Sequence, residues 1–229
     1  MKIAGYQLIK INIMINEHIK ATHDYYMTDR SQLLQLVRGT PMRVLELGCG
    51  AGTLLKELKS LGCTYVCGIE VREDIAIQAR DNSGANDVIV ADIEKSPPDF
   101  PAESFDLIIA SHVLEHMVDP WKVTNQLVSW LKPGGQFVGA IPNVRHIKAV
   151  LPLVFSGTWK YEETGLLDWT HLRFFTRAEI QKLIVSANLE IEGVYPEFGG
   201  PRSQLLRLLS LGLLTDFVAY AYRFSAWKK

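Results

Sequence analysis

The chain has 229 residues, of which 48% are hydrophobic and 21% are charged, a composition that suits one large globular domain with appendages. Its formal net charge of −1 gives no bulk electrostatic case for binding a nucleic-acid polyanion. Cys49, Cys63 and Cys67 lack paired CxxC spacing, so neither a disulfide framework nor a zinc site is indicated. The first residues do not form a signal-peptide pattern, and we expect a reduced, cytoplasmic protein; Met14 is an alternative start.

Short apolar runs alternate with helical patterns from residue 43 onward. Five runs are predicted as strands: 43–47, 65–71, 87–92, 105–116 (ending in a loop) and 136–143. Three stretches between them are predicted as helices: 53–62, 73–80 and 121–135. Alternation of this kind predicts an α/β fold, a parallel sheet with helices on both faces.

The alternation of strand and helix patterns ends after residue 142. Residues 143–175 hold an apolar segment and many aromatics but no clean strand, and we expect an insertion that covers the ligand edge of the sheet. Thr176 and Glu179 form a capping box at the start of the next helix. A sixth strand is predicted over 189–197, a leucine-rich helix over 203–214 and a last strand over 217–227.

One rival interpretation of the tail is a single membrane helix from 205 to 222. Arg207, Gly212 and Asp216 interrupt that stretch, and the cost of inserting them into a bilayer disfavours it.

The segment VLELGCGAGT (44–53) is a strand that enters a glycine-rich turn. It lacks the Lys-Ser or Lys-Thr pair of a phosphate-binding P-loop, and Thr53 stands where the dinucleotide fingerprint needs its third small residue. The remaining pattern is [DE]xGxGxG, formed by Glu46 and glycines 48, 50 and 52. It suits a ligand that carries an ammonium group and no phosphate.

Two more acids end the next two predicted strands. Glu70 stands 22 residues after Gly48, where a carboxylate can accept hydrogen bonds from both ribose hydroxyls. Asp92, with Ile93 beside it, can meet an adenine amino group and ring face. Together with Glu46, these acids indicate a nucleoside with a positively charged tail at the carboxyl edge of a parallel sheet.

The motifs ELGCGAG, GIE, ADIEKSPPDFPAESFDLIIASHVLEHMVDP and LKPGGQFVGAIPN resemble those of the class I S-adenosylmethionine-dependent methyltransferases, from about residue 43 to the C-terminus. The resemblance implies a Rossmann-like, doubly wound, seven-stranded sheet whose last strand is antiparallel and lies between its neighbours. A narrower likeness, in IPNVRH, LPLVFSGTW and GLLDWTHLRFFT, is to a branch associated with polysaccharide and other sugar-modifying pathways.

The resemblance also implies roles for individual residues. Residues 41–229 would be the methyltransferase domain, with a substrate lid over 143–175, and residues 1–40 a helical cap that closes over the cofactor. The positions expected at the cofactor are Glu46, Gly48, Cys49, Gly50 and Gly52 at the methionine part, Glu70 and Val71 at the ribose, Asp92 and Ile93 at the adenine, Ser111 and His112 on the methionine side, and Tyr25 or Arg30 in the cap.

The acceptor side has one candidate base. The pKa of an unperturbed histidine lies near neutrality, so His171 is able to take a proton from an acceptor hydroxyl, with Asp168 orienting its ring. The alternative is that Asp168 and Thr170 cap a turn while His171 bonds a backbone carbonyl. Arg173 either holds an anionic acceptor group or pairs with Asp168, and the pairing is favoured.

Three further residues, Asn143, Arg145 and His146, follow the fifth strand at the edge where an acceptor would lie, and either contact it or make loop hydrogen bonds. Glu115 and His116 raise a metal alternative, because some related quinone-pathway O-methyltransferases use acids and histidines in this region. One such pair is too little for a metal site, so we expect none.

We therefore expect a methyltransferase that acts on a small polar acceptor, with a sugar hydroxyl, nucleotide-linked or lipid-linked, in first place. The alternatives are a quinone-type or other small-molecule O-methyltransferase, an amino-sugar N-methyltransferase, and a cofactor-binding scaffold without turnover. The [DN]PP[YF] motif of DNA-adenine methylation is absent, so nucleic acid is not an expected partner. No transmembrane segment is expected, and contact with a membrane surface is a weaker alternative suggested by basic residues of the tail.

Overall fold

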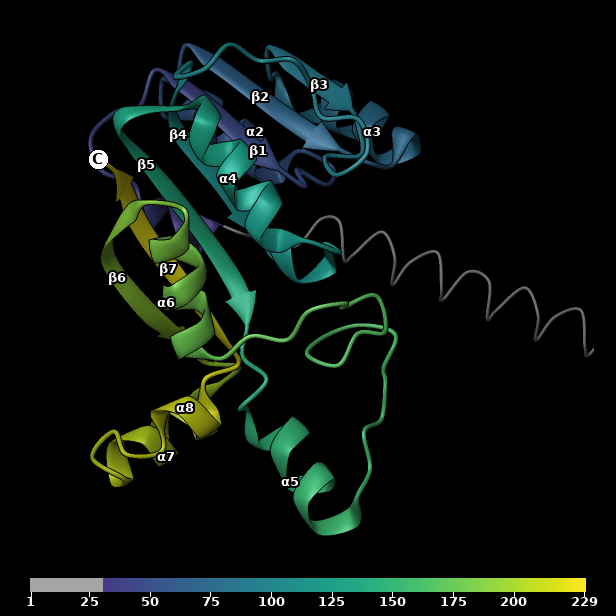
Figure 1. The fold of residues 1–229 in the computed structure, drawn as a ribbon, viewed down its shortest axis with the longest axis vertical. Coiled ribbons are helices and arrows are strands. Elements are labelled where there is room, and N and C mark those ends of the chain that lie inside the picture. The colour runs from purple at the N-terminus through teal and green to yellow at the C-terminus, as the bar shows by residue number, and fades with distance from the viewer. Residues whose placement is uncertain (1–30) are drawn as a thin grey trace, which may run out of the picture.

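A computed structural model describes residues 31–229 of the chain (Figure 1). Its centre is a seven-stranded sheet in the order β3-β2-β1-β4-β5-β7-β6. The first five strands run parallel to one another, and β7 runs antiparallel to both of its neighbours, β5 and β6. This is the sheet that the sequence predicts. Tyr25 and Arg30, the two expected cofactor contacts of the cap, lie outside the described residues.

The strands are β1 (Arg43–Leu47), β2 (Tyr65–Glu70), β3 (Asp87–Val90), β4 (Phe105–Ser111), β5 (Leu131–Pro142), β6 (Leu189–Glu197) and β7 (Ala221–Lys228). The helices are α2 (Thr53–Ser60), α3 (Glu73–Ser83), α4 (Pro120–Trp130), α5 (Ile147–Ser156), α6 (Arg177–Ser186), α7 (Pro201–Leu209) and α8 (Thr215–Val218), with short 3₁₀ helices η1 (Ser31–Leu36) and η2 (Leu114–His116).

Each face of the sheet buries its own apolar cluster. Helices α2 and α3, with η1, cover one face through residues such as Leu55, Leu58 and Ala79. Helices α4 and α6 cover the other face, where Leu127 and Ile180 are fully buried. Because both faces are covered, the parallel strands are apolar runs rather than alternating ones.

The order of the strands sets where a ligand can lie. The chain winds outward from β1 through β2 to β3, then crosses back so that β4 pairs with the other side of β1. The loops after β1 and β4 therefore leave the carboxyl edge of the sheet in opposite directions, which is the position where open α/β sheets typically bind their ligands. Every acid of the predicted cofactor site lies at or near this edge.

Several boundaries differ from the prediction: β3 ends at Val90 rather than 92, and α7 spans Pro201–Leu209 rather than 203–214. Helix α4 ends at Trp130, and β5 begins at Leu131 because Leu131 pairs with Phe105 and is fully buried. The last strand begins at Ala221 rather than 217, since Thr215–Val218 forms the short helix α8. The alternating pattern of the tail did not separate these two elements.

The insertion contains a helix that the sequence reading did not identify. Helix α5 has Pro152 in its interior, and proline normally interrupts a helix. It is nevertheless capped at both ends: His146 Nδ1 accepts from the Lys148 N–H (3.2 Å), and Gly157 ends it in the left-handed conformation with φ of 63°. Within residues 31–229, no helix is both long and apolar enough to cross a membrane.

Candidate active site at the carboxyl edge of the sheet

The glycine loop between β1 and α2 is closely packed on both sides. Gly48, Gly50 and Gly52 all have positive φ, of 68°, 54° and 85°. A Cβ on Gly48 would lie 2.9 Å from Val113 Cγ2, and one on Gly52 would lie 3.0 Å from the Ala79 Cα. Both the backbone conformation and the lack of space therefore require glycine, so the loop is held in one shape before any ligand binds.

Glu70 fixes this loop to the end of β2. Its buried carboxylate accepts a hydrogen bond from the Gly50 N–H at Oε2 (3.0 Å) and one from the Arg72 N–H at Oε1 (3.1 Å). Glu46, one strand away on β1, is also fully buried. Two carboxylates thus lie on adjacent strands at the predicted cofactor edge, and Glu70 keeps lone pairs for further donors such as ribose hydroxyls.

Asp92 is more exposed and already engaged. Its Oδ2 accepts from Lys95 Nζ (2.7 Å), and its Oδ1 accepts from the Glu94 N–H (3.0 Å). The hydrogen bond from Lys95 lowers the pKa of Asp92. Ile93 beside it is buried, whereas Val71 is exposed. Asp92 therefore shapes the turn after β3, and its contact with adenine stays a prediction.

The end of β4 carries a strained residue. Ser111 is buried, and the next residue, His112, has φ of 50°, a conformation that costs energy for a residue with a side chain. The His112 N–H donates to the Ala140 carbonyl (2.9 Å), which holds the turn. His112 Nδ1 lies 3.5 Å from Glu115 Oε1. The strain thus directs an imidazole toward a buried carboxylate.

Glu115 on η2 is the point where the insertion meets the sheet. Its backbone carbonyl accepts from the N–H groups of Leu172 and Arg173 (2.9 and 3.0 Å). Its side chain is buried, and within residues 31–229 neither carboxylate oxygen accepts a hydrogen bond. The nearby His112 lowers the pKa of Glu115 against a desolvation effect that raises it, so the carboxylate is charged.

His171 reaches this cluster from the insertion. Its Nδ1 bonds the Leu166 carbonyl (3.1 Å), and because a carbonyl only accepts, Nδ1 carries the proton in the neutral ring. The unprotonated Nε2 then faces Glu115 Oε1 at 4.0 Å. Burial lowers the pKa of His171, although the Glu115 charge opposes that shift. The ring is therefore neutral near pH 7, and the lone pair of its Nε2 faces Glu115.

The structure shows the alternative arrangement, in which Asp168 caps a turn with Thr170 and His171 bonds a backbone carbonyl, and Asp168 makes no hydrogen bond to the His171 ring. Its Oδ1 accepts from the N–H of Thr170 (2.8 Å) and from the Thr170 hydroxyl (2.7 Å), which caps the turn. The Leu166 carbonyl orients His171 in its place. Asp168 does not bond His171 because its carboxylate already accepts two hydrogen bonds within its own tight turn.

The expected Arg173–Asp168 pair is also wrong. Arg173 Nε donates to the Val118 carbonyl (2.9 Å), and its Nη2 bonds the same oxygen. Arg173 thereby ties the insertion to the loop before α4.

Three potential metal ligands lie close together. Glu115, His116 and His171 offer ligand atoms that all lie within 4.8 Å of one another. Ligands of zinc or magnesium lie about 2.0–2.2 Å from the ion, so adjacent ligands are roughly 3–3.5 Å apart and opposite ligands of an octahedral site about 4.2 Å apart. The 4.0 Å between His171 Nε2 and Glu115 Oε1 matches opposite rather than adjacent positions. The expectation that the site holds no metal stays a prediction.

The three candidates after β5 make structural contacts. Buried Asn143 donates through Nδ2 to the carbonyls of Asp216 (2.7 Å) and Ala219 (2.8 Å). Arg145 pairs with the Asp216 carboxylate at 2.9 Å. His146 caps α5, and desolvation lowers its pKa. Together they join the end of β5 to the start of β7, so their role as acceptor contacts stays a prediction.

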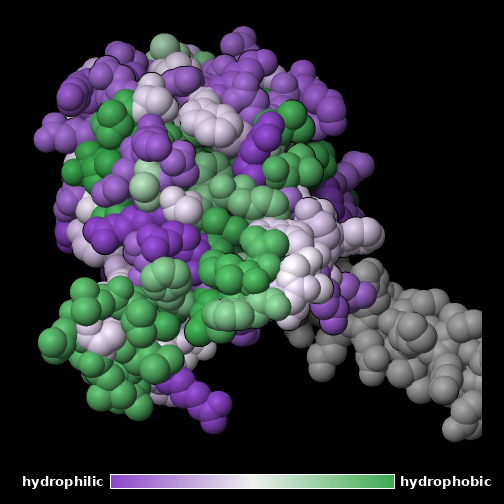
Figure 2. Space-filling view, turned by 60° about the horizontal axis from the view of Figure 1, so that its bottom comes forward, coloured by the Kyte–Doolittle hydropathy of each residue, from purple (hydrophilic) through white to green (hydrophobic). Residues whose placement is uncertain are grey.

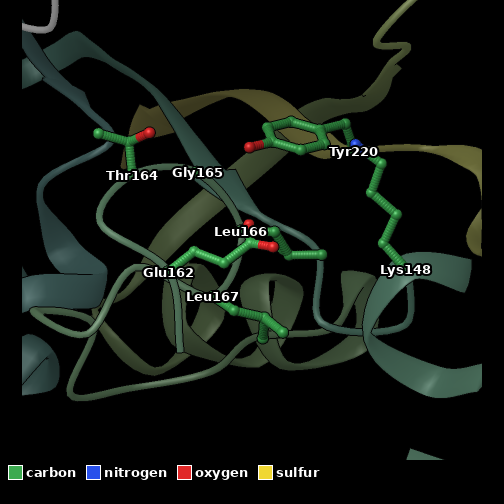
Figure 3. Close-up of a pocket in the computed structure, with 7 residues that line it drawn as sticks. All are labelled: Lys148, Glu162, Thr164, Gly165, Leu166, Leu167 and Tyr220. Carbon is green, nitrogen blue, oxygen red and sulfur yellow. The ribbon is translucent and has the colours of Figure 1, made fainter. Parts of the chain in front are cut away.

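A small cavity lies beside the insertion (Figure 3). Its volume is about 240 Å³, and it is lined by Lys148, Glu162, Thr164, Gly165, Leu166, Leu167 and Tyr220. Lys148 extends from α5 toward Tyr220, and Glu162 lies across from it (Figure 3). A Cβ on Gly165 would lie 2.9 Å from the Tyr220 hydroxyl, which leaves room only for glycine. The cavity contacts the site directly, because Leu166 also holds His171.

The sequence analysis considers Glu115 only as half of a possible metal pair and so misses its contact with His171. The two residues are 56 positions apart, and only folding of the insertion brings them together. The motif HVLEH (112–116) could have indicated this contact. A glutamate is rarely buried without a partner, and this one lies between two histidines at the end of a predicted strand.

Comparison with known proteins adds to this geometry. A family model described as a methyltransferase domain matches residues 18–194. A ubiquinone biosynthesis O-methyltransferase of Neisseria meningitidis is 28% identical over 159 residues, which cover 65% of this chain and 64% of that protein's length. A protein of the same name from Xanthomonas euvesicatoria is 29% identical over 196 residues, covering 79% of this chain and 76% of that one.

Solved structures share the fold. A S-adenosylmethionine-dependent methyltransferase of Mesorhizobium loti superposes with a TM-score of 0.63 at 24% identity, covering 86% of this chain and 96% of that one. A possible histamine N-methyltransferase of Thermotoga maritima gives 0.65 at 21% identity, with 94% and 96% covered.

Proposed function

Because this chain belongs to the S-adenosylmethionine-dependent methyltransferases with a class I fold, we propose that it methylates a hydroxyl group of a small acceptor. O-methylation is supported mainly by His171, which is buried and neutral and has an unprotonated Nε2. A hydroxyl acceptor benefits from such a base, whereas an unprotonated amine needs none.

The cofactor would be held by the edge of β1, β2 and β3. Glu70 would accept from the ribose hydroxyls, since its carboxylate is already fixed by the Gly50 N–H. Glu46 and the glycine loop would contact the methionine part, and Asp92 with Ile93 the adenine. Ser111 and His112 would line the methionine side. When bound, S-adenosylmethionine supplies an electrophilic methyl group on a sulfonium.

The chain's own contribution to the transfer would be to place the acceptor and to take its proton. His171 accepts the hydroxyl proton at Nε2, while its Nδ1–H remains bonded to Leu166. The Glu115 carboxylate, 4.0 Å from Nε2, stabilises the positive charge that the ring gains. Asp168 would have an indirect, positioning role, because its hydrogen bond from Thr170 holds the turn that carries His171. Much of the rest of the rate enhancement would come from holding the acceptor oxygen in line with the methyl group.

Two acceptor classes have separate support. The names of the relatives favour an aromatic hydroxyl of a quinone-type molecule, and this is the acceptor we place first. A sugar hydroxyl is the second candidate, because the cavity near His171 is lined by Lys148, Glu162 and Tyr220, which suit a ligand with several hydroxyls. An amino-sugar nitrogen is a less favoured acceptor, because an unprotonated amine does not need His171 as a base.

The test uses S-adenosylmethionine with a labelled methyl group and three acceptor panels: catechol-type aromatics, free and nucleotide- or lipid-linked sugars, and amino sugars. We expect transfer to an oxygen of the first panel. Transfer only to sugar oxygens would replace the first acceptor class by the second. Transfer only to nitrogen would contradict the role of His171. Cofactor binding without transfer to any panel would support a scaffold.

A further inference from the structure

Two segments of the chain leave large apolar side chains outside the core. Helix α7 has no buried residue, and the leucines of this helix and its following loop are exposed, with Leu211 at 92% and Leu213 at 85%. Helix α5 buries only Ala149, and Phe155 at its end is 80% exposed. We call the exposed side chains of both segments the apolar face: Leu151, Leu153, Val154, Phe155, Leu205, Leu206, Leu208, Leu209, Leu211, Leu213 and Leu214.

The two segments project from the same end of the molecule. In Figure 1, α5 and α7 both extend below the sheet, at the end toward which the β5 arrow points. Figure 2 shows two green areas on this end, a projecting lobe at the lower left of the view and a patch beside it in the centre. Exposed apolar surface of this extent on a soluble protein marks a binding surface. The end that carries it is also the end where the insertion and its cavity lie.

The charge of these segments has one sign. Residues 147–160 contain Lys148 and Lys160 and no acidic residue, and residues 199–214 contain Arg202 and Arg207 and no acidic residue. All four basic residues are exposed. The chain as a whole has a net charge of −1, so the basic excess is local. Leucine and phenylalanine combined with lysine and arginine are the composition of helices that lie in a membrane interface.

We propose that the apolar face docks on the surface of a bilayer that contains anionic phospholipids. Helices α5 and α7, of 10 and 9 residues, are too short to span a membrane and would lie in its interface. A bilayer surface can accommodate both projecting helices at once, because it is deformable and needs no grooves that match their separation. A second copy of the chain would instead have to offer two grooves at the matching separation.

Docking in this way would bring the acceptor edge against the lipid. An acceptor carried on a lipid tail then enters beside α5 and places its hydroxyl near His171 without leaving the membrane. This narrowing of the acceptor rests on the proposed function, whereas the docking itself does not. The test below therefore measures binding to lipid apart from methyl transfer.

Flotation of the full chain with vesicles would measure the docking. We expect co-flotation with vesicles of phosphatidylcholine and phosphatidylglycerol, and at least tenfold less with phosphatidylcholine alone. The paired variants Leu209→Glu/Leu213→Glu and Val154→Glu/Phe155→Glu should each reduce co-flotation by about tenfold or more. Leu61→Glu is the matched control, because Leu61 is a leucine with 57% exposure outside the apolar face. Its co-flotation should equal that of the unchanged chain.

Cofactor affinity and thermal unfolding of every variant should match the unchanged chain, which separates this proposal from the proposed function. Absence of co-flotation with anionic vesicles would overturn the docking. So would a dimer in light scattering that dissociates on Leu209→Glu/Leu213→Glu, because a second copy would then cover the face. Equal loss in Leu61→Glu would also overturn it, since the effect would not belong to this surface.

Discussion

The proposed cofactor edge and the proposed acceptor edge of this protein are built in opposite ways. At the proposed cofactor edge, Glu46 and Glu70 are buried, and Glu70 is fixed to the glycine loop by a hydrogen bond from the Gly50 N–H. At the proposed acceptor edge, His171 comes from an insertion, Glu115 from the short helix η2, and the helix α5 beside them is largely exposed. A fixed site suits a cofactor that is the same for every member of a family. An added, exposed segment suits an acceptor that differs between members.

The largest effect should come from removing the proposed base. His171→Ala and His171→Gln should both lower kcat by roughly 10²–10⁴-fold while leaving cofactor affinity unchanged, because only the proton acceptor is lost. Steady-state kinetics and calorimetric titration measure the two quantities. A histidine that only supports the turn predicts a different outcome: stability falls first, and Gln partly restores activity by keeping a donor for the Leu166 carbonyl.

At the cofactor edge, Glu70→Ala should weaken cofactor binding by about 100-fold, since two charge-assisted hydrogen bonds to a ribose contribute about 1.5–3 kcal/mol each, less the solvation regained. Glu73→Ala, an exposed acid at the start of α3, is the control and should bind normally. Calorimetric titration measures both. Unchanged affinity of Glu70→Ala would mean that the ribose lies elsewhere.

The rigidity of the cofactor edge can be tested without a ligand. Gly52→Ala should lower the free energy of unfolding by about 2–4 kcal/mol, because a positive φ and a contact with Ala79 both oppose a Cβ. Gly62→Ala has a similar φ of 90° but open space, and should cost about 1 kcal/mol. Urea unfolding compares them. Equal costs would show that packing does not hold the loop.

The pH dependence tests the acceptor edge. Burial lowers the pKa of His171, so the unprotonated, active form persists to a lower pH than for a free histidine. The rate kcat/KM should rise to its plateau with a midpoint below about 6.5 and be lost as the pH falls through it. Glu115→Gln removes the charge that favours the imidazolium and should move the midpoint lower. A midpoint above 6.5 would exclude this assignment.

The smallest expected effect is that of Asp92→Asn. Because Asp92 is already paired with Lys95 and partly exposed, its loss should weaken cofactor binding by roughly tenfold or less. A loss as large as that of Glu70→Ala would place Asp92 among the principal contacts, and the cofactor edge would then depend equally on all three strand ends.

The sheet, and the placement of Glu46, Glu70 and the glycine loop at one of its edges, could be predicted because they depend on local patterns. Strand–helix alternation, a glycine turn and acids at strand ends are each contained in a few consecutive residues, and the predicted antiparallel last strand is present. The acceptor edge could not be predicted in the same way. Asp168 is satisfied within its own turn and Arg173 bonds a carbonyl 55 residues away, choices that depend on the folded path of the insertion.

Helix α5 was missed for a related reason. Pro152 argues against a helix locally, yet caps at His146 and Gly157 and the packing of Ala149 against Leu166 and Leu167 stabilise it. The leucine-rich pattern predicts the helix α7, and only the folded structure shows that no element within residues 31–229 covers its leucines.

The most direct test of the central claim is calorimetric titration of the unchanged chain with S-adenosylmethionine. The buried carboxylates and the closely packed glycine loop predict one cofactor per chain, bound at the edge that holds Glu46 and Glu70. The same titration of Glu70→Ala should show the weaker binding stated above. Absence of binding by the unchanged chain at millimolar cofactor would contradict the account.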